Sequence, residues 1–350
     1  MSPRANQPLR PAPASIEDRG QPRFGTYAGS LPEVNLARLK GPYRLPGPLR
    51  FAKHKRWFYA MVASPEVLAV FSVADLGYAA NAFACAIHLT ERRVLFDAGY
   101  MGLPRPFTAV SNHPAAGAQA RFHAPGIAMR LARPGQEDAY RISARARKWR
   151  GTRLSCDGQL AGGRAPPITV IAPVPGDGVV NVTQKWATLE LSGMLEAGDR
   201  TFSLDGGVGG LDYTNGYLGR RTSWRWAFAS GRLSSGVTFG LNLVEGFNEA
   251  TDEANENALW LDDQLIPIGR ARFEYDIGQV MKAWRISTED GAVELNFVPI
   301  HAHREERDYK LVKSRFIQPL GIFEGTVRVG QSSFPIERLP GVVEDQDVLW

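Results

Sequence analysis

Apolar and polar positions alternate most clearly along Arg221–Ala229. A period of two is typical of a strand with one buried face. One face would carry Thr222, Trp224, Trp226 and Phe228, and the other Arg221, Ser223, Arg225 and Ala227. We therefore expect a strand with a bulky apolar wall on one side and two guanidinium groups on the other.

Short apolar or alternating runs recur along the rest of the chain, separated by turn signals. The predicted strands are 56–62, 67–74, 78–89, 94–97, 119–123, 127–131, 140–149, 168–172, 186–195, 221–229, 236–244, 258–261, 265–268, 272–277, 282–288, 293–298, 309–317 and 321–329. Turns are expected at Cys156-Asp157-Gly158 and Thr214-Asn215-Gly216. No amphipathic helix of ten residues is convincing. This spacing predicts an all-β protein of barrel or sandwich type.

The chain has 350 residues, which exceeds the usual size of a single core. We expect a proline-rich extended segment over 1–50, a first β-barrel-like domain over 51–205 and a second over 206–350. Two antiparallel barrels or half-barrels packed together are the simplest arrangement, with residues 211–228 near their junction.

The N-terminal sequence is proline-rich and lacks the apolar core of a signal peptide, so we expect a loose surface tail there. No window of about eighteen apolar residues predicts a membrane-spanning helix. Two cysteines, Cys85 and Cys156, are too few for a disulfide framework, which favours a cytoplasmic location.

The net charge of +5 is concentrated in residues 1–60 and 141–164. Basic surfaces attract anionic lipid headgroups or nucleic acid, although most are simply solvated. The basic run 141–153 alternates like an exposed strand face. We therefore expect no nucleic-acid binding and leave peripheral contact with a membrane surface open.

Most of the candidate site residues fall within residues 211–228. These candidates are Asp212, Tyr213, Asn215, Arg220, Arg221, Trp224, Arg225 and Trp226. In one interpretation Asp212 sits on a loop and pairs with an arginine as a structural strut. In the other, the acid and the arginines line a tryptophan-walled pocket for a mostly apolar ligand.

Three other segments carry weaker signals. Asn255 and Asn257 form either a polar turn or the rim of a binding mouth. His301 and His303 share a strand face, but no third metal ligand can be assigned, so we expect no metal site. The glycine run 206–210 does not match a phosphate-binding loop, and no cofactor is expected.

Several of these residues also carry a family resemblance. Asp212-Tyr213-Thr214-x-Gly216, Arg220-Arg221-Thr222-x-Trp224-x-Trp226-Ala227, Ala74-Asp75-Leu76-Gly77-Tyr78 and Gly341-Val342-x-Glu344-Asp345 to Trp350 resemble the bacterial DUF2804 family of unknown function. More distantly, the architecture resembles double lipocalin-like proteins that include carotenoid hydratases and tocopherol cyclases. That resemblance implies a calycin-type fold and an aromatic-lined cavity for isoprenoid-like molecules.

The leading functional hypothesis is a binding protein for an apolar, lipid-like or isoprenoid-like small molecule. The first alternative is an acid–base enzyme of hydratase, cyclase or isomerase type, with Asp212 as proton donor. A donor needs a pKa raised by burial, whereas an arginine partner would lower it. The second alternative is a structural or partner-binding module. The oligomeric state is not predicted.

Overall fold

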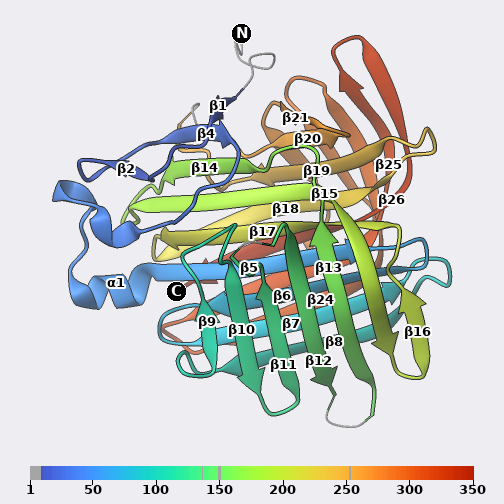
Figure 1. The fold of residues 1–350 in the computed structure, drawn as a ribbon, viewed down its shortest axis with the longest axis horizontal. Helices are drawn as coiled ribbons and strands as arrows, with labels where there is room; N and C mark the ends of the chain where they lie inside the picture. The colour runs from blue at the N-terminus through green and yellow to red at the C-terminus, as the bar shows by residue number, and fades with distance from the viewer. Residues whose placement is uncertain (1–8, 136, 149–150, 252–253) are drawn as a thin grey trace.

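The computed structural model describes residues 9–135, 137–148, 151–251 and 254–350, which form two large, mainly antiparallel sheets (Figure 1). The strands of the first sheet are β1 (Arg10–Pro11), β4 (Gly25–Ala28), β5 (His54–Ala63), β6 (Val67–Asp75), β7 (Ala80–His88), β8 (Arg93–Gly102), β9 (Thr108–Val110), β10 (Gln119–Ala124), β11 (Ile127–Ala132), β12 (Ala139–Arg147), β13 (Arg153–Ala161), β14 (Ile168–Pro173), β15 (Val180–Ala197), β16 (Arg200–Ser203) and β17 (Gly207–Tyr217). Those of the second are β18 (Arg221–Arg232), β19 (Thr238–Glu245), β20 (Ala258–Leu261), β21 (Gln264–Pro267), β22 (Ala271–Glu274), β23 (Trp284–Thr288), β24 (Val293–Asp308), β25 (Lys313–Val329) and β26 (Ser332–Leu349). A small pair, β2 (Glu17–Asp18) and β3 (Gln21–Pro22), the helix α1 (Gly47–Lys53) and short 3-10 turns complete the described fold.

The first sheet curls into an almost closed barrel in the order β8-β7-β6-β5-β17-β15-β13-β12-β11-β10-β9. Its two ends approach each other, because β9 lies against β5 and β6 while β10 lies against β8. In β12 the alternation is strict: Tyr140 and Ile142 are buried, whereas Arg141 and Arg145 are exposed. The basic run at 141–147 is therefore the solvated outer face of a barrel strand, as its pattern predicts.

The second sheet forms a half-barrel in the order β21-β20-β19-β18-β26-β25-β24-β23-β22, and β19 lies against β22. Its interior is a separate apolar core that includes Phe239, Leu241, Trp284, Phe297 and Phe323. Because each curved sheet has its own core, the prediction of two lipocalin-like barrels or half-barrels is confirmed.

A further apolar cluster fills the space between the two sheets. Strand β5 contributes side chains to the core on each of its faces. Phe58 packs inside the first barrel, while Tyr59 and Met61 point toward the second sheet. Trp226 and Phe228 of β18 meet them from the opposite side. A strand buried on both faces explains the nearly continuous apolar sequence of β5 and β6. Residues 211–228 therefore lie at the junction, as expected.

The structure differs from the expected turns in two places. Residues 156–158 lie within β13 and residues 214–216 within β17. At Gly216 the glycine permits close packing, because a Cβ there would lie 2.6 Å from Asn181 Oδ1 and 2.9 Å from the Val180 carbonyl oxygen. Strand β17 pairs with β5 and β15, so it belongs to the first sheet, and the chain enters the second sheet only at Arg221. The sequence pattern predicts the domain boundary earlier, at 205/206.

The described part of the N-terminal segment is integrated into the fold, which corrects the expectation of a loose tail. Strand β1 pairs with β4 and β4 with β14, and Ile16, Leu31 and Val34 are buried in the core of the first barrel. Their apolar side chains, spaced between prolines and turns, anchor the segment. Within the described residues, no helix has the length and apolar character needed to span a membrane.

Candidate functional site

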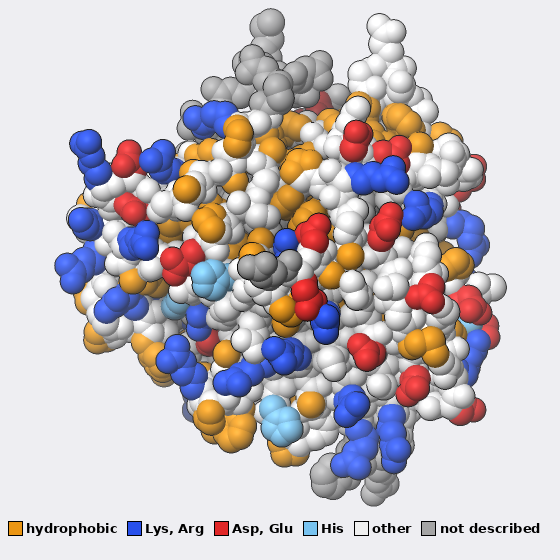
Figure 2. All heavy atoms as spheres, viewed as in Figure 1, with side chains coloured by type: hydrophobic (Ala, Val, Ile, Leu, Met, Phe, Trp, Pro, Cys, Tyr) orange, Lys and Arg blue, Asp and Glu red, His pale blue; other side chains and the backbone are white. Residues whose placement is uncertain are grey.

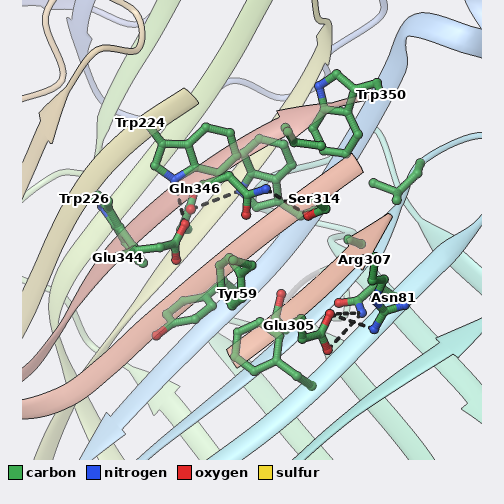
Figure 3. Close-up of a pocket in the computed structure, with 18 of the residues that line it drawn as sticks. Tyr59, Asn81, Trp224, Trp226, Glu305, Arg307, Ser314, Glu344, Gln346 and Trp350 are labelled. Carbon is green, nitrogen blue, oxygen red and sulfur yellow. Dashed lines mark hydrogen bonds and ion pairs between the residues drawn. The ribbon is translucent and has the colours of Figure 1, made fainter. Parts of the chain in front are cut away.

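A cavity of about 340 Å³ lies between the two sheets, outside the interior of either barrel. It is walled mainly by the aromatic side chains of Trp57, Tyr59, Phe83, Trp224, Trp226, Phe247, Phe316 and Trp350. Figure 3 shows Tyr59 from the first sheet and Trp224 and Trp226 from the second among the residues that line this cavity. The volume is within the range of small-molecule sites.

Two tryptophans of β18 form the wall that the alternation predicts. Trp224 stacks on Trp57 of β5, with ring centroids 5.8 Å apart and planes inclined by 21°. Trp226 meets the Tyr59 ring edge-on at 5.3 Å. Because each contact joins a strand of the first sheet to a strand of the second, the aromatic wall also fastens the two barrels together.

A buried charged cluster closes the deep end of the cavity. Lys185 Nζ lies 2.8 Å from Asp212 Oδ1, 3.6 Å from Glu256 Oε2 and 5.0 Å from the centre of the Trp226 ring. Burial lowers the pKa of Lys185, but the two carboxylates outweigh it and the net direction is upward. The ammonium therefore remains charged, and it offsets charge on two buried acids.

Glu344 of β26 is the other acid of the deep end. Its Oε1 accepts a hydrogen bond from the Trp224 indole N–H at 2.6 Å, and its Oε2 accepts one from the Gln318 amide at 2.7 Å. Burial raises the pKa of Glu344 to about 7, against the opposing effect of these hydrogen bonds. Near neutral pH this carboxyl can thus both hold and release a proton.

A second polar group lies near the opening. Asn81 Nδ2 donates to Glu305 Oε2 at 2.9 Å, and the Arg307 guanidinium donates to the same oxygen at 2.9 Å (Figure 3). Nearby Tyr309 and Met101 also line the cavity and are exposed to solvent. The cavity is therefore polar at both ends and aromatic between them.

Of the residues predicted from sequence, Asp212, Trp224 and Trp226 line this cavity. Tyr213 and Asn215 project from the opposite face of β17 into the first barrel. There the Tyr213 hydroxyl donates to the Ser111 carbonyl at 3.0 Å, and Asn215 Nδ2 donates to the Tyr213 hydroxyl at 3.0 Å. Residues 212–215 continue a strand instead of forming the predicted turn. Successive side chains of a strand point to opposite faces, so Tyr213 and Asn215 face away from Asp212.

The three predicted arginines lie away from Asp212. Arg220 is in the loop after β17, Arg221 pairs with Asp347 at 3.1 Å, and the Nε of Arg225 donates to the Tyr275 hydroxyl at 3.2 Å. The expected Asp212–arginine pair is therefore wrong: the partner is Lys185. Lys185 precedes Asp212 by 27 residues in the chain, and the two come together only because β15 and β17 pair in the folded sheet. Local sequence therefore does not predict this partner.

The asparagine cluster follows its turn-chemistry interpretation. Asn257 Oδ1 accepts from the Val244 backbone N–H at 2.6 Å, and Asn255 Nδ2 donates to the Ile268 carbonyl at 2.7 Å. Neither asparagine is among the residues that line the cavity, whereas Glu256 between them reaches the Lys185 ammonium. The side-chain amides of Asn255 and Asn257 thus fix the backbone of this loop, which positions the Glu256 carboxylate near Lys185.

His301 and His303 both contact Asp97 of the first barrel. His301 Nε2 lies 2.7 Å from Asp97 Oδ2, and His303 Nδ1 lies 2.5 Å from Asp97 Oδ1. Burial lowers the pKa of His303, but the hydrogen bonds and negative charges of Asp97 and Glu305 outweigh burial and raise this pKa to about 9. Cys85, Asp97 and His301 offer ligand atoms within 4.8 Å of one another, so the fold brings together a third candidate ligand, Cys85, that the sequence pattern does not assign. The contacts of Asp97 with both histidines link β8 to β24.

Several cavity residues carry no signal strong enough to mark them in the sequence, namely Trp57, Tyr59, Asn81, Lys185, Glu256, Glu305, Arg307, Glu344, Gln346 and Trp350. One weaker signal could have found some of them. Glu344, Gln346, Val348 and Trp350 share one face of the last strand by the period of two. Lys185 has no such signal, because Thr183 and Gln184 before it are polar and the predicted strand begins after it, at Trp186.

Comparison with solved structures gives similar folds at low identity. A candidate AttH protein from Nitrosomonas europaea is 14% identical, with a TM-score of 0.44 over 87% of this chain and 98% of its own. Kievitone hydratase from Nectria haematococca is 11% identical, with a TM-score of 0.46 over 93% of this chain and 98% of its own. A search of curated proteins gives no match. The sequence profile "Domain of unknown function (DUF2804)" matches residues 11–350, a span that contains all but the first residue of the two sheets and every residue that lines the cavity, so the chain belongs to the DUF2804 family.

Proposed function

We propose that this protein binds a largely apolar small molecule in the cavity between its two barrels. The observation that carries the proposal is the cavity itself, which has about 340 Å³ of space walled by indole and phenyl rings with a few convergent polar groups. Binding sites for small molecules have this composition, because apolar walls supply affinity and a few polar groups fix orientation.

The two polar ends define the ligand further. At the deep end, the carboxyl of Glu344 and the Lys185 cluster match a hydroxyl, carbonyl or similar group on the ligand. At the opening, Asn81 and Arg307 donate hydrogen bonds beside Glu305. We therefore expect an aromatic or isoprenoid-like body that carries at least one oxygen function.

Capture of the ligand tests this proposal. Native mass spectrometry and solvent extraction of the purified protein should release an apolar small molecule, and the emptied protein should take up the fluorescent probe N-phenyl-1-naphthylamine. Ala74 lines the cavity, so Ala74→Trp should fill it and abolish uptake. The matched control is Ala128→Trp, at an exposed strand position. Uptake by Ala74→Trp equal to that of the control, with no extracted ligand, contradicts the proposal.

A second candidate function is proton transfer to or from the bound molecule, with Glu344 as the acid or base. Its specific support is the pKa of about 7, which burial gives to this carboxyl beside two indole rings. The indole of Trp224 would stabilise positive charge on a protonated alkene, whereas the ring of Trp226 already has the Lys185 ammonium over it. Asp212, the donor hypothesised from sequence, lies 2.8 Å from an ammonium and is better suited to an ion pair.

Deuterium incorporation tests this second function on the extracted ligand itself. The ligand is returned to the protein in deuterated water and then analysed by mass spectrometry. Carbon-bound deuterium should appear with the wild type and be lost in Glu344→Gln. Equal incorporation by Glu344→Gln and wild type, or none by either, contradicts a catalytic role for Glu344.

A further inference from the structure

The opening of the cavity is surrounded by exposed apolar side chains. On α1, Leu49 is 45% exposed and Phe51 is 58% exposed. The segment between β24 and β25 adds Tyr309 at 64% and Leu311 at 75%, and Met101 at the end of β8 is also exposed. Large apolar side chains grouped at one place on a surface mark an interaction site more often than isolated ones do.

Direct contacts tie these two segments to the opening. The carbonyl oxygen of Phe51 would lie 2.3 Å from a Cβ at Gly77, whose neighbours Leu76 and Tyr78 both line the cavity. Gly77 also has a φ of +85°, so the tight turn under α1 requires glycine. Figure 1 shows α1 beside the C terminus, where Trp350 completes the cavity wall.

A chain of polar contacts links α1 to the segment after β24. Lys53 Nζ lies 2.5 Å from Asp177 Oδ2, and Asp177 Oδ1 accepts from the Arg220 backbone N–H at 2.8 Å. The Arg220 guanidinium in turn donates to the Leu311 carbonyl. These contacts connect α1 to the segment that carries Tyr309 and Leu311, and Tyr309 itself lines the cavity.

Basic side chains accompany this apolar surface. The segments that form it carry six basic residues, Arg50, Lys53, Arg220, Arg307, Lys310 and Lys313, and four acids, Asp177, Glu305, Glu306 and Asp308. Figure 2 shows Lys and Arg side chains gathered toward the end of the molecule that carries α1, with apolar side chains between them. Exposed apolar groups within a basic surround are complementary to an anionic lipid headgroup region.

We propose that this surface docks the protein onto an anionic phospholipid bilayer, with Phe51, Tyr309 and Leu311 inserted among the headgroups. The opening then faces the bilayer, so an apolar ligand passes between lipid and cavity without crossing water. This role rests on the proposed ligand-binding function, because docking at the opening serves a molecule that partitions into lipid. Tyr309, which is both exposed and part of the lining, would lie at the transition between the two.

Vesicle flotation tests the docking. The full-length protein is mixed with phosphatidylcholine vesicles that either contain or lack phosphatidylglycerol, at low and at high salt. We expect flotation with the anionic vesicles at low salt and a strong decrease in the other conditions. The double variant Phe51→Ser/Leu311→Ser should float about tenfold less, since both side chains are exposed and neither lines the cavity. The matched control is Ile277→Ser/Met281→Ser, which removes two exposed apolar residues from the connection between β22 and β23 and should bind like wild type.

Uptake of N-phenyl-1-naphthylamine from water, without vesicles, separates this proposal from the proposed function. Normal probe uptake together with equal flotation of the Phe51→Ser/Leu311→Ser and control variants overturns membrane docking alone. Normal uptake with no flotation of wild type on anionic vesicles does the same. Loss of probe uptake by wild type would instead contradict the ligand-binding function on which docking rests.

Discussion

The indole N–H of Trp224 donates a hydrogen bond to Glu344 Oε1 at 2.6 Å, across the paired strands β18 and β26. Trp224 stands opposite Gln346 in the register, so Glu344 is its diagonal neighbour on the same face. The bond joins the carboxyl group with the raised pKa to the aromatic wall of the cavity. It therefore couples the protonation of Glu344 to the side chain that a ligand would contact.

Glu344→Gln should remove a pH dependence of stability. The folded-state pKa of about 7 lies above the ordinary value of 4.5, so the folded protein binds more protons than the unfolded chain between these values. Wild-type stability should therefore fall as the pH rises through this window, by on the order of 3 kcal/mol, and remain lower above it. Urea unfolding across the window should show a flatter profile for Glu344→Gln. Glu337→Gln, an exposed site on the same strand, should keep the wild-type slope.

Trp224→Phe should raise the pKa of Glu344 further. The Trp224 hydrogen bond lowers this pKa by stabilising the charged carboxylate, and phenylalanine keeps an aromatic ring while removing the donor. Carbon-detected NMR of the Glu344 carboxyl across a pH series measures the change. Trp226→Phe is the control, because its indole donates to Asn242 Oδ1 at 2.7 Å instead. A midpoint for Trp224→Phe at or below that of wild type contradicts the assigned role of the bond.

Local alternation is enough to predict most strands and one wall of the cavity. The period of two along 221–229 places Trp224 and Trp226 on one face and Arg221 and Arg225 on the other, as the structure has them. Turn and glycine spacing likewise predicts the all-β class and the two-barrel arrangement. These features depend on neighbours in sequence, which the pattern records directly.

The partners across the sheets cannot be predicted in this way. Lys185 reaches Asp212 because β15 and β17 are adjacent in the barrel, and Glu344 reaches the cavity because β26 pairs with β18. Neither pairing has a signature in local sequence, since register is fixed by which faces are buried after folding. Sequence proximity instead favours arginines as partners of Asp212, and the structure places them elsewhere.

Lys185→Met should strongly destabilise the protein at neutral pH. It leaves Asp212 and Glu256 buried without their ammonium partner, and loss of one member of a buried charge cluster costs about 3–5 kcal/mol. Guanidinium unfolding should show this loss, and Lys185→Met/Asp212→Asn should recover part of it by removing one unpaired charge. Lys282→Met, at an exposed position, is the control. If the single variant is as stable as wild type, the cluster does not act as an ion pair.

Asp97→Asn should weaken the link between the barrels in a defined pH range. The pKa of His303 is raised to about 9 from the ordinary 6.5, so the stability that this histidine contributes is fully present below about 6.5 and is lost as the pH rises through 9. The difference in unfolding free energy between wild type and Asp97→Asn should thus be largest near pH 6, about 1–3 kcal/mol for a charge-assisted hydrogen bond, and should shrink above pH 9. Asp157→Asn, an exposed position on β13, should show no such difference. A difference for Asp97→Asn that stays constant from pH 6 to above 9 would mean that His303 is neutral and only a neutral hydrogen bond joins β8 to β24.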